Sequence, residues 1–174
     1  MTAPEFSRAR RLDTLGSREE QVRIEADADE RRRLAGRFGL IALDRLEADY
    51  RLARDGDVVT ATGRLVAEVV QPCSVTEDPV PAAIDTGFTI RFVPDDPGAG
   101  EDELELDEAD CDTVFYEGGA IDLGEAAAET LALALDPYPR SPGAAAALKE
   151  AGVLGEGEIG PFGGLAALRE KLGR

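Results

Sequence analysis

The feature that most constrains this chain is the stretch from Gly118 to Arg140, which reads GGAIDLGEAAAETLALALDPYPR. Asp122 is a candidate helix N-cap, because its carboxylate can accept hydrogen bonds from backbone N–H groups two or three residues later. Glu125 follows at the position that completes a capping box, and its charge suits the positive end of the helix dipole. Pro137 and Pro139 forbid further helix. The stretch therefore predicts a helix with a defined beginning and a defined end.

One face of this helix is built from small and branched side chains. Leu131 and Leu135 are four residues apart and share a face with Ala127 and Ala128. Alanine side chains let a helix approach its neighbour closely. We therefore expect this face to lie against something broad, most simply a sheet.

Alternating apolar and polar residues predict strands in four places: residues 21–26, 58–70, 87–93 and 113–117. Asp55-Gly56 is a strong hairpin signal. The segment before it, residues 40–54, fits both helical and strand spacing, and the turn favours a strand from about Leu46. Gly63 predicts a bulge. Pro79 and Pro81 confine residues 75–83 to a sheet edge or an irregular segment.

A second helix is expected from Asp27 to about Arg37, because Asp27 and Glu30 form a D-x-x-E start signal and Gly39 is a natural stop. The outer side of this helix is the one basic concentration in the sequence. Its guanidinium groups suit RNA phosphates, but they also suit a solvated face paired with the acids at positions 27, 29 and 30. The candidate RNA-binding residues are Arg31, Arg32, Arg33 and Arg37.

Charge divides the chain into two parts. The net charge is −17 over 174 residues. Residues 1–54 hold 12 Arg and 11 Asp or Glu, whereas residues 55–174 hold 7 Lys or Arg and 25 Asp or Glu. The second part would repel a phosphate backbone, because nucleic-acid affinity comes mainly from cations. Direct RNA contact must then come from the N-terminal part, and the acidic part suits a basic protein partner.

The side-chain inventory argues against catalysis. The chain has no histidine and two cysteines, Cys73 and Cys111, which excludes Ser-His and Cys-His arrangements. A zinc site would need two carboxylates beside both thiolates, and a single disulfide is not favoured without a signal peptide, so two free thiols are expected. No glycine-rich piece matches a phosphate-binding fingerprint. We expect no enzymatic activity, no metal and no cofactor.

Organisation and location follow from composition. No apolar run reaches the ~20 residues that span a bilayer, so we expect a cytoplasmic protein that binds neither membrane nor DNA. Residues 94–109 are intensely acidic and read as an exposed loop. We predict a single α+β domain over 1–140, followed by an Ala/Gly-rich tail over 141–174. The tail has short helices at 144–151 and 161–172, joined by a flexible linker.

The predicted fold class is therefore α+β. Its sheet is antiparallel, twisted and barrel-like, and two or three helices pack on it.

Several segments together resemble a known family: PEFSRARRLD, RFGLIALDRLEADYRL, VVQPCSVTEDPVP, GGAIDLGEAAAETLALALDPYPRSPGA and the closing PFGGLAALREKL. This combination is similar to the YceD family, the large ribosomal RNA subunit accumulation proteins. The resemblance covers most of the chain and is most specific from Ile121 to Pro139. The positions that carry the family motif, and that we treat as interaction candidates, are Cys73, Ile121, Asp122, Leu123, Glu129, Leu131, Leu133, Pro137 and Pro139.

The resemblance implies a role in the synthesis, processing or stability of the RNA of the large ribosomal subunit (23S), without an enzymatic activity to carry over. Relatives with further cysteines after the helix suggest a metal site, but the matching DPYPRSPGA has none. The partner would be ribosomal RNA or a basic large-subunit ribosomal protein. The alternatives are a general or chaperone-like protein-interaction module without a ribosomal role, and a hydrolase or metal enzyme with converging carboxylates.

Overall fold

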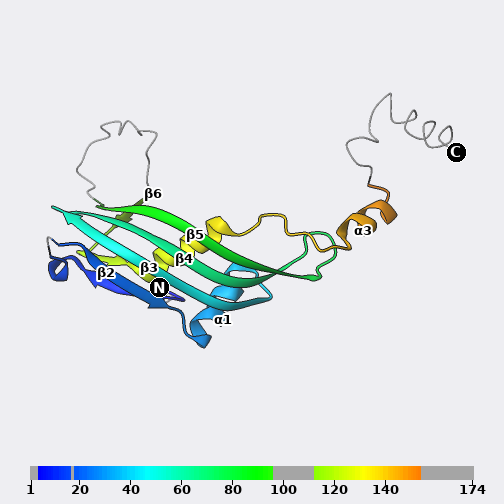
Figure 1. Cartoon of the computed structure of the whole chain (residues 1–174), viewed down its shortest axis with the longest axis horizontal. Coiled ribbons are helices and arrows are strands. Elements are labelled where there is room, and N and C mark those ends of the chain that lie inside the picture. The colour runs from blue at the N-terminus through cyan, green and yellow to red at the C-terminus, as the bar shows by residue number, and fades with distance from the viewer. Residues whose placement is uncertain (1–3, 17, 96–111, 154–174) are drawn as a thin grey trace, which may run out of the picture. The chain divides into compact units, whose positions relative to one another are not determined.

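The structure is a computed structural model that describes residues 4–16, 18–95 and 112–153 (Figure 1). In chain order its elements are β1 (Ala9–Arg11), the 3-10 turn η1 (Leu12–Thr14), β2 (Glu20–Glu25), α1 (Ala28–Phe38), β3 (Ala42–Asp55), β4 (Val58–Pro72), β5 (Pro79–Pro94), β6 (Asp112–Tyr116), β7 (Ala120–Asp122), α2 (Leu123–Ala134) and α3 (Ala144–Glu150).

The chain separates into two compact units. Unit 1 takes the described residues of Met1–Gln71 and Pro81–Pro137, and unit 2 takes those of Pro72–Val80 and Tyr138–Arg174. The predicted division into a domain and a tail at residue 140 stays a prediction. Apart from Gly152 and Val153, the predicted linker 152–160 lies outside the described residues. The predicted helix 161–172, Cys111 and nearly all of the acidic loop 94–109 also lie outside them.

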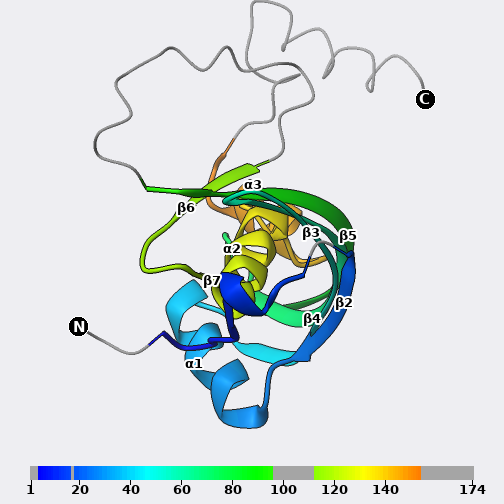
Figure 2. The same ribbon diagram turned by 90° about the vertical axis from the view of Figure 1, so that its left-hand side faces the viewer.

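The main sheet has five strands in the order β2-β3-β4-β5-β6, and it curves around α2 (Figure 2). The β2–β3 and β3–β4 pairs are antiparallel, whereas β6 runs parallel to β5. In the described part of the chain β2 and β6 are two separate edges, so the sheet is open and the predicted barrel-like closure is not confirmed. The α+β class is confirmed, with α1, α2 and α3 as its helices.

The ambiguous segment before the Asp55-Gly56 turn is the long strand β3, and the turn closes a hairpin in which Asp55 pairs with Val58. Gly56 has a φ of 61°, which glycine adopts without strain. The predicted bulge at Gly63 is wrong. Gly63 pairs in register with Tyr50, and the register shift lies between Leu43 and Arg45 instead.

Steric crowding explains Gly63. A Cβ at this position would collide with the carbonyl oxygen of Asp49 and lie 2.5 Å from Cζ of Phe88. The missing side chain therefore lets the Phe88 ring pack against Tyr50, with the two ring centroids 4.9 Å apart.

Residues 79–94 form one continuous strand, where the sequence predicted an interrupted segment and a separate strand. Pro79 and Pro81 lie in the first part of β5, and β6 pairs only with the last part, Ile90–Pro94. In the described part of the chain, no strand pairs with the proline-containing part of β5 on the side where β6 lies. This suits proline, because proline has no N–H group to donate to a neighbouring strand. The parallel β5–β6 pair was not predicted. It needs a crossover of roughly a dozen residues or more, which residues 95–111 are long enough to provide.

Both predicted helices of unit 1 are confirmed with their end signals. Asp27 caps α1 through a full capping box with Glu30, and Gly39 ends it in the left-handed conformation with a φ of 64°. The Asp122 carboxylate accepts from the N–H groups of Gly124 and Glu125 at 2.9 and 3.2 Å. The helix ends at Ala134, ahead of the prolines.

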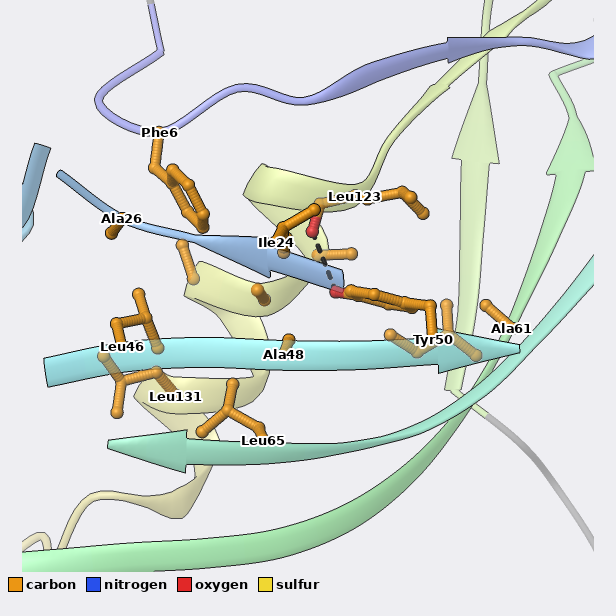
Figure 3. Packing of buried hydrophobic residues seen from close by; sticks show 14 of the residues in the cluster. Phe6, Ile24, Ala26, Leu46, Ala48, Tyr50, Ala61, Leu65, Leu123 and Leu131 are labelled. Carbon is orange, nitrogen blue, oxygen red and sulfur yellow. Dashed lines mark hydrogen bonds between the residues drawn. The ribbon is translucent and has the colours of Figure 1, made fainter. Parts of the chain in front are cut away.

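The core lies between α2 and the concave face of the sheet (Figure 3). Ala127, Ala128 and Leu131 are fully buried, which confirms that the small face of the helix packs closely on strands. The Tyr50 hydroxyl donates a 2.8 Å hydrogen bond to the carbonyl oxygen of Leu123 at the start of α2. Burial raises the pKa of Tyr50, so its hydroxyl stays protonated and keeps this hydrogen bond.

In unit 2, the predicted short helix from residue 144 is present as α3. Of the helices that the structure describes, each is too short or too polar to cross a bilayer.

Candidate functional site

The arginines of α1 are largely bound to other groups of unit 1. Arg31 donates to the carbonyl oxygen of Ala26 at 2.6 Å, and Arg33 donates to the carbonyl oxygen of Glu5 at 2.9 Å. Arg32 is the most exposed, with 76% of its side chain accessible, and it pairs with Asp29 at 2.7 Å. The guanidinium groups of Arg31 and Arg33 therefore help to hold the helix in position.

Arg37 joins α1 to α2. Its guanidinium contacts both carboxylate oxygens of Glu125, at 2.7 and 3.0 Å, and a carboxylate oxygen of Glu5 at 3.2 Å. The hydrogen bond with Glu125 raises the pKa of Arg37 further. Arg37, a candidate RNA-binding residue of α1, is thus ion-paired with Glu125 of α2, the helix that carries most of the motif positions.

The outward side of α2 combines carboxylates with apolar surface. We call this surface the α2 ridge, made of Glu125, Glu129, Ala132 and Leu133. These residues follow helical spacing and therefore form one continuous stripe. Leu133 is 77% exposed, more than any other large hydrophobic residue that the structure describes.

The surroundings of Glu129 on the α2 ridge disfavour its ionised form. Partial burial and the neighbouring charge of Glu125 raise the pKa of Glu129, and Arg37 offsets this only in part. In the described part of the chain, the Glu129 side chain has no hydrogen bond or ion pair. A cation placed against the ridge would relieve this repulsion.

The remaining motif residues of this helix have structural positions. Ile121, Leu123 and Leu131 are buried in the core, and Pro137 is exposed at the end of unit 1. Asp122 has partners beyond the cap, since it accepts from the Ser7 hydroxyl at 2.5 Å and from the Arg8 N–H at 2.7 Å. These residues make the helix start rigid and so hold the ridge in place.

Cys73 and Pro139 belong to unit 2. The Cys73 thiol is 2% exposed, and its sulfur accepts from the N–H groups of Ser141 at 3.2 Å and Val75 at 3.5 Å. Burial alone would raise the pKa of the thiol, but these N–H groups and the hydroxyls of Thr76 and Ser141 lower it to about 6. The Pro139 carbonyl oxygen accepts from the Ser74 N–H at 2.8 Å.

In residues 4–16, 18–95 and 112–153, no three His, Cys, Asp or Glu side chains lie close enough together to hold a metal ion.

Sequence reasoning missed two parts of the structure. Arg8 grips Glu30 with two hydrogen bonds of 2.7 and 2.8 Å, which attaches the N-terminal segment to α1 and lowers the pKa of Glu30. Gly124 lies so close to this segment that a Cβ would be 2.6 Å from the carbonyl oxygen of Phe6. The glycine inside the first turn of a capped helix was the available signal for this close approach.

A family model described as "Large ribosomal RNA subunit accumulation protein YceD" matches residues 61–169, which is more than half of the chain. No curated protein and no solved structure matches the chain.

Proposed function

Because this chain belongs to the YceD family of large ribosomal RNA subunit accumulation proteins, we propose that it is a non-enzymatic ribosome-biogenesis factor. It acts in the cytoplasm and supports the synthesis, processing or stability of 23S ribosomal RNA. Its mode of action is binding, and the α2 ridge holds a basic protein of the large subunit. The observation that carries this proposal is the ridge itself, where Glu129 and Leu133 lie exposed side by side.

The chemistry of the ridge suits a basic segment with an apolar anchor. Lys or Arg side chains would be attracted by Glu129, and an apolar side chain would bury the exposed surface of Leu133. No Lys or Arg occurs between Arg91 and Arg140, so the sequence on either side of the ridge adds no positive charge. Arg37 of α1 is a cation at the ridge, and it is already paired with Glu125. The long-range field of the acidic part also speeds the approach of such a partner.

The non-enzymatic assignment is supported by how the polar side chains are used. Asp122 caps a helix, Glu30 grips Arg8, and the Tyr50 hydroxyl closes the start of α2. Each of these groups has a structural partner that a catalytic role would have to displace.

The binding proposal is tested by pull-down of purified basic large-subunit proteins on the full chain, at low and at high salt. We expect capture at low salt and release at high salt. Glu129→Lys and Leu133→Ser should each weaken capture about tenfold, because charge reversal and loss of the apolar anchor act on the same contact. Glu19→Lys, an equal charge change at another exposed position of unit 1, is the matched control.

Capture of no basic large-subunit protein at either salt concentration would end the proposal, as would ridge variants that bind like the control. A ribosomal role is separated from a general interaction module in cells. Gene deletion should lower 23S RNA, and the Glu19→Lys chain should restore it better than the Leu133→Ser chain. Failure to co-sediment with pre-ribosomes would favour the general module.

A second candidate is direct RNA binding through Arg31, Arg32, Arg33 and Arg37. It is favoured by the exposure of Arg32. The other three would have to exchange the acceptors that they already hold for phosphate oxygens, which makes this the weaker candidate. Arg32→Gln should lower RNA affinity if the second candidate is right.

A further inference from the structure

An open hollow lies on the outer face of the main sheet, the face that points away from α2. It measures about 840 Å³ and is lined by residues of β2, β3, β4 and β5. Its polar side chains come from positions that alternate with buried ones, such as Arg51 beside the buried Tyr50 and Leu52. This size is in the range of small-molecule sites.

Three guanidinium groups and one carboxylate, that of Asp49, line the hollow. The three guanidinium groups differ in their partners. Arg64 pairs with Asp85, and Arg23 pairs with Glu47 at 2.6 Å and with Asp49 at 3.9 Å. In the part of the chain that the structure describes, Arg51 makes no hydrogen bond or ion pair. Arg51 therefore offers its donors to a ligand without breaking an existing contact.

Polar groups flank Arg51 on both neighbouring strands. The sheet register places Gln21 of β2 and Thr62 of β4 directly opposite Arg51, one on each side. All three side chains are exposed on the same face. A carboxamide, a guanidinium and a hydroxyl thus form a row across three strands, and Thr89 of β5 also lines the hollow.

Gly87 leaves space in the hollow, although no steric clash requires a glycine at this position. A Cβ on Gly87 would meet its nearest atom, the carbonyl oxygen of Gly63, at an ordinary 3.7 Å, and its φ is not in the left-handed region. A glycine inside a strand weakens the strand, and it often marks a place where a ligand approaches the backbone closely. Gly87 therefore differs from Gly63, whose side chain is excluded by crowding.

We propose that this hollow binds a single-stranded RNA segment, with Arg51 on a phosphate and the Gln21, Thr62 and Thr89 side chains on neighbouring hydroxyl groups. Arg51 supplies the planar fork that matches phosphate oxygens. Hydroxyl and carboxamide groups beside it can pair with the 2′-hydroxyl, which distinguishes RNA from DNA. This site goes beyond the α2 ridge and does not need the protein partner.

The overall negative charge does not exclude this site. The hollow belongs mostly to strands of residues 1–71, where the charges nearly balance up to residue 54. At physiological salt, charges more than ~8 Å away are largely screened, so the local Arg51 dominates at short range. Binding should therefore be measurable near physiological ionic strength, where the distant acidic charges are screened, and it should weaken at higher salt.

The test measures fluorescence anisotropy of a short labelled single-stranded RNA with the full chain near physiological ionic strength. Arg51→Gln removes the charge, and Gly87→Thr fills the hollow. Arg51→Gln should weaken RNA binding about tenfold, as loss of one charge-assisted hydrogen bond implies. Gly87→Thr should also weaken binding, because its side chain occupies space that the RNA needs. Gly87→Thr should melt no lower than the wild type, because a β-branched residue replaces a strand glycine. Arg11→Gln, an exposed ion-paired arginine of β1, is the matched control.

The same assay contains the outcomes that would overturn the site. Equal loss in Arg11→Gln would show unspecific attraction, and equal affinity for DNA of the same sequence would remove the assignment to RNA. Displacement of the RNA by inorganic phosphate at equal phosphate concentration would indicate a free-phosphate site instead. Loss in Arg32→Gln without loss in Arg51→Gln would move RNA binding to α1. None of these results bears on the α2 ridge, because no protein partner is present.

Discussion

Among single residues, Cys73 of unit 2 combines burial with an acidic thiol. Its sulfur accepts backbone N–H groups, and its pKa falls to about 6. The chain has no histidine, so few other groups titrate between pH 6 and 9. A lowered pKa in the folded state means that the folded protein holds the proton less tightly than the unfolded chain does.

The free energy of unfolding should therefore increase as the pH rises from about 6 to about 9. The same contribution is lost as the pH falls back through the folded pKa of Cys73. The measurement is the free energy of unfolding in urea across this range. A Cys111→Ser background leaves Cys73 as the one thiol. Adding Cys73→Ser should flatten the profile, and a slope that survives this second substitution would contradict the assignment.

The residues of the hollow show what a single sequence does not reveal. Arg51 and Gly87 each fit an ordinary exposed strand position, and only the strand register brings Gln21, Arg51 and Thr62 into one row. By contrast, Asp122 and Asp27 were predictable, because a cap depends on residues two or three positions away. Among the site residues, those with local contacts were predicted and those with cross-strand contacts were not.

Among the elements, α2 depends on the N-terminal segment for its start. Asp122 accepts from Gly124, Glu125, Ser7 and the backbone of Arg8, and β1 pairs with β7 directly before it. The sequence predicted the helix, its cap and its buried face. It did not predict β1, β7, the continuity of β5 or the parallel β6, because these follow from pairings between distant residues.

Asp122→Ala should lower the free energy of unfolding by about 2 kcal/mol, since it removes the cap and leaves the Arg8 N–H without its acceptor. Glu19→Ala, an exposed acid away from these contacts, should change it by less than about 0.5 kcal/mol. Urea unfolding followed by circular dichroism measures both. A loss in Asp122→Ala no larger than in the control would show that the cap does not stabilise the helix start.

At the scale of the whole molecule, a net charge of −17 on 174 residues sets the balance of electrostatic forces. Like charges repel more strongly in the compact state than in the unfolded chain. The exposed ion pairs, such as Arg11 with Asp13, each contribute little. Composition alone indicated this imbalance, but the division into two compact units required the structure.

Added salt should therefore stabilise the protein. Raising sodium chloride from low ionic strength to about 0.5 M should increase the Tm by a few degrees, because screening removes more repulsion than attraction. Calorimetry measures this, and potassium chloride should act equally, since screening depends on ionic strength. A Tm that falls with salt would mean that the ion pairs outweigh the net charge.

The pairing of β1 with β7 affects how the chain folds while it is being made. Arg8 and its acceptor Asp122 are 114 positions apart. At the usual 5–20 residues per second, the N-terminal segment waits roughly 6 to 23 s for its partner to be synthesised. During that interval Phe6, fully buried in the finished protein, lacks the α2 helix that lies beside it. The segment around Phe6 and Arg8 is thus synthesised well before it can become native, and that interval is when a chaperone would be most useful to it.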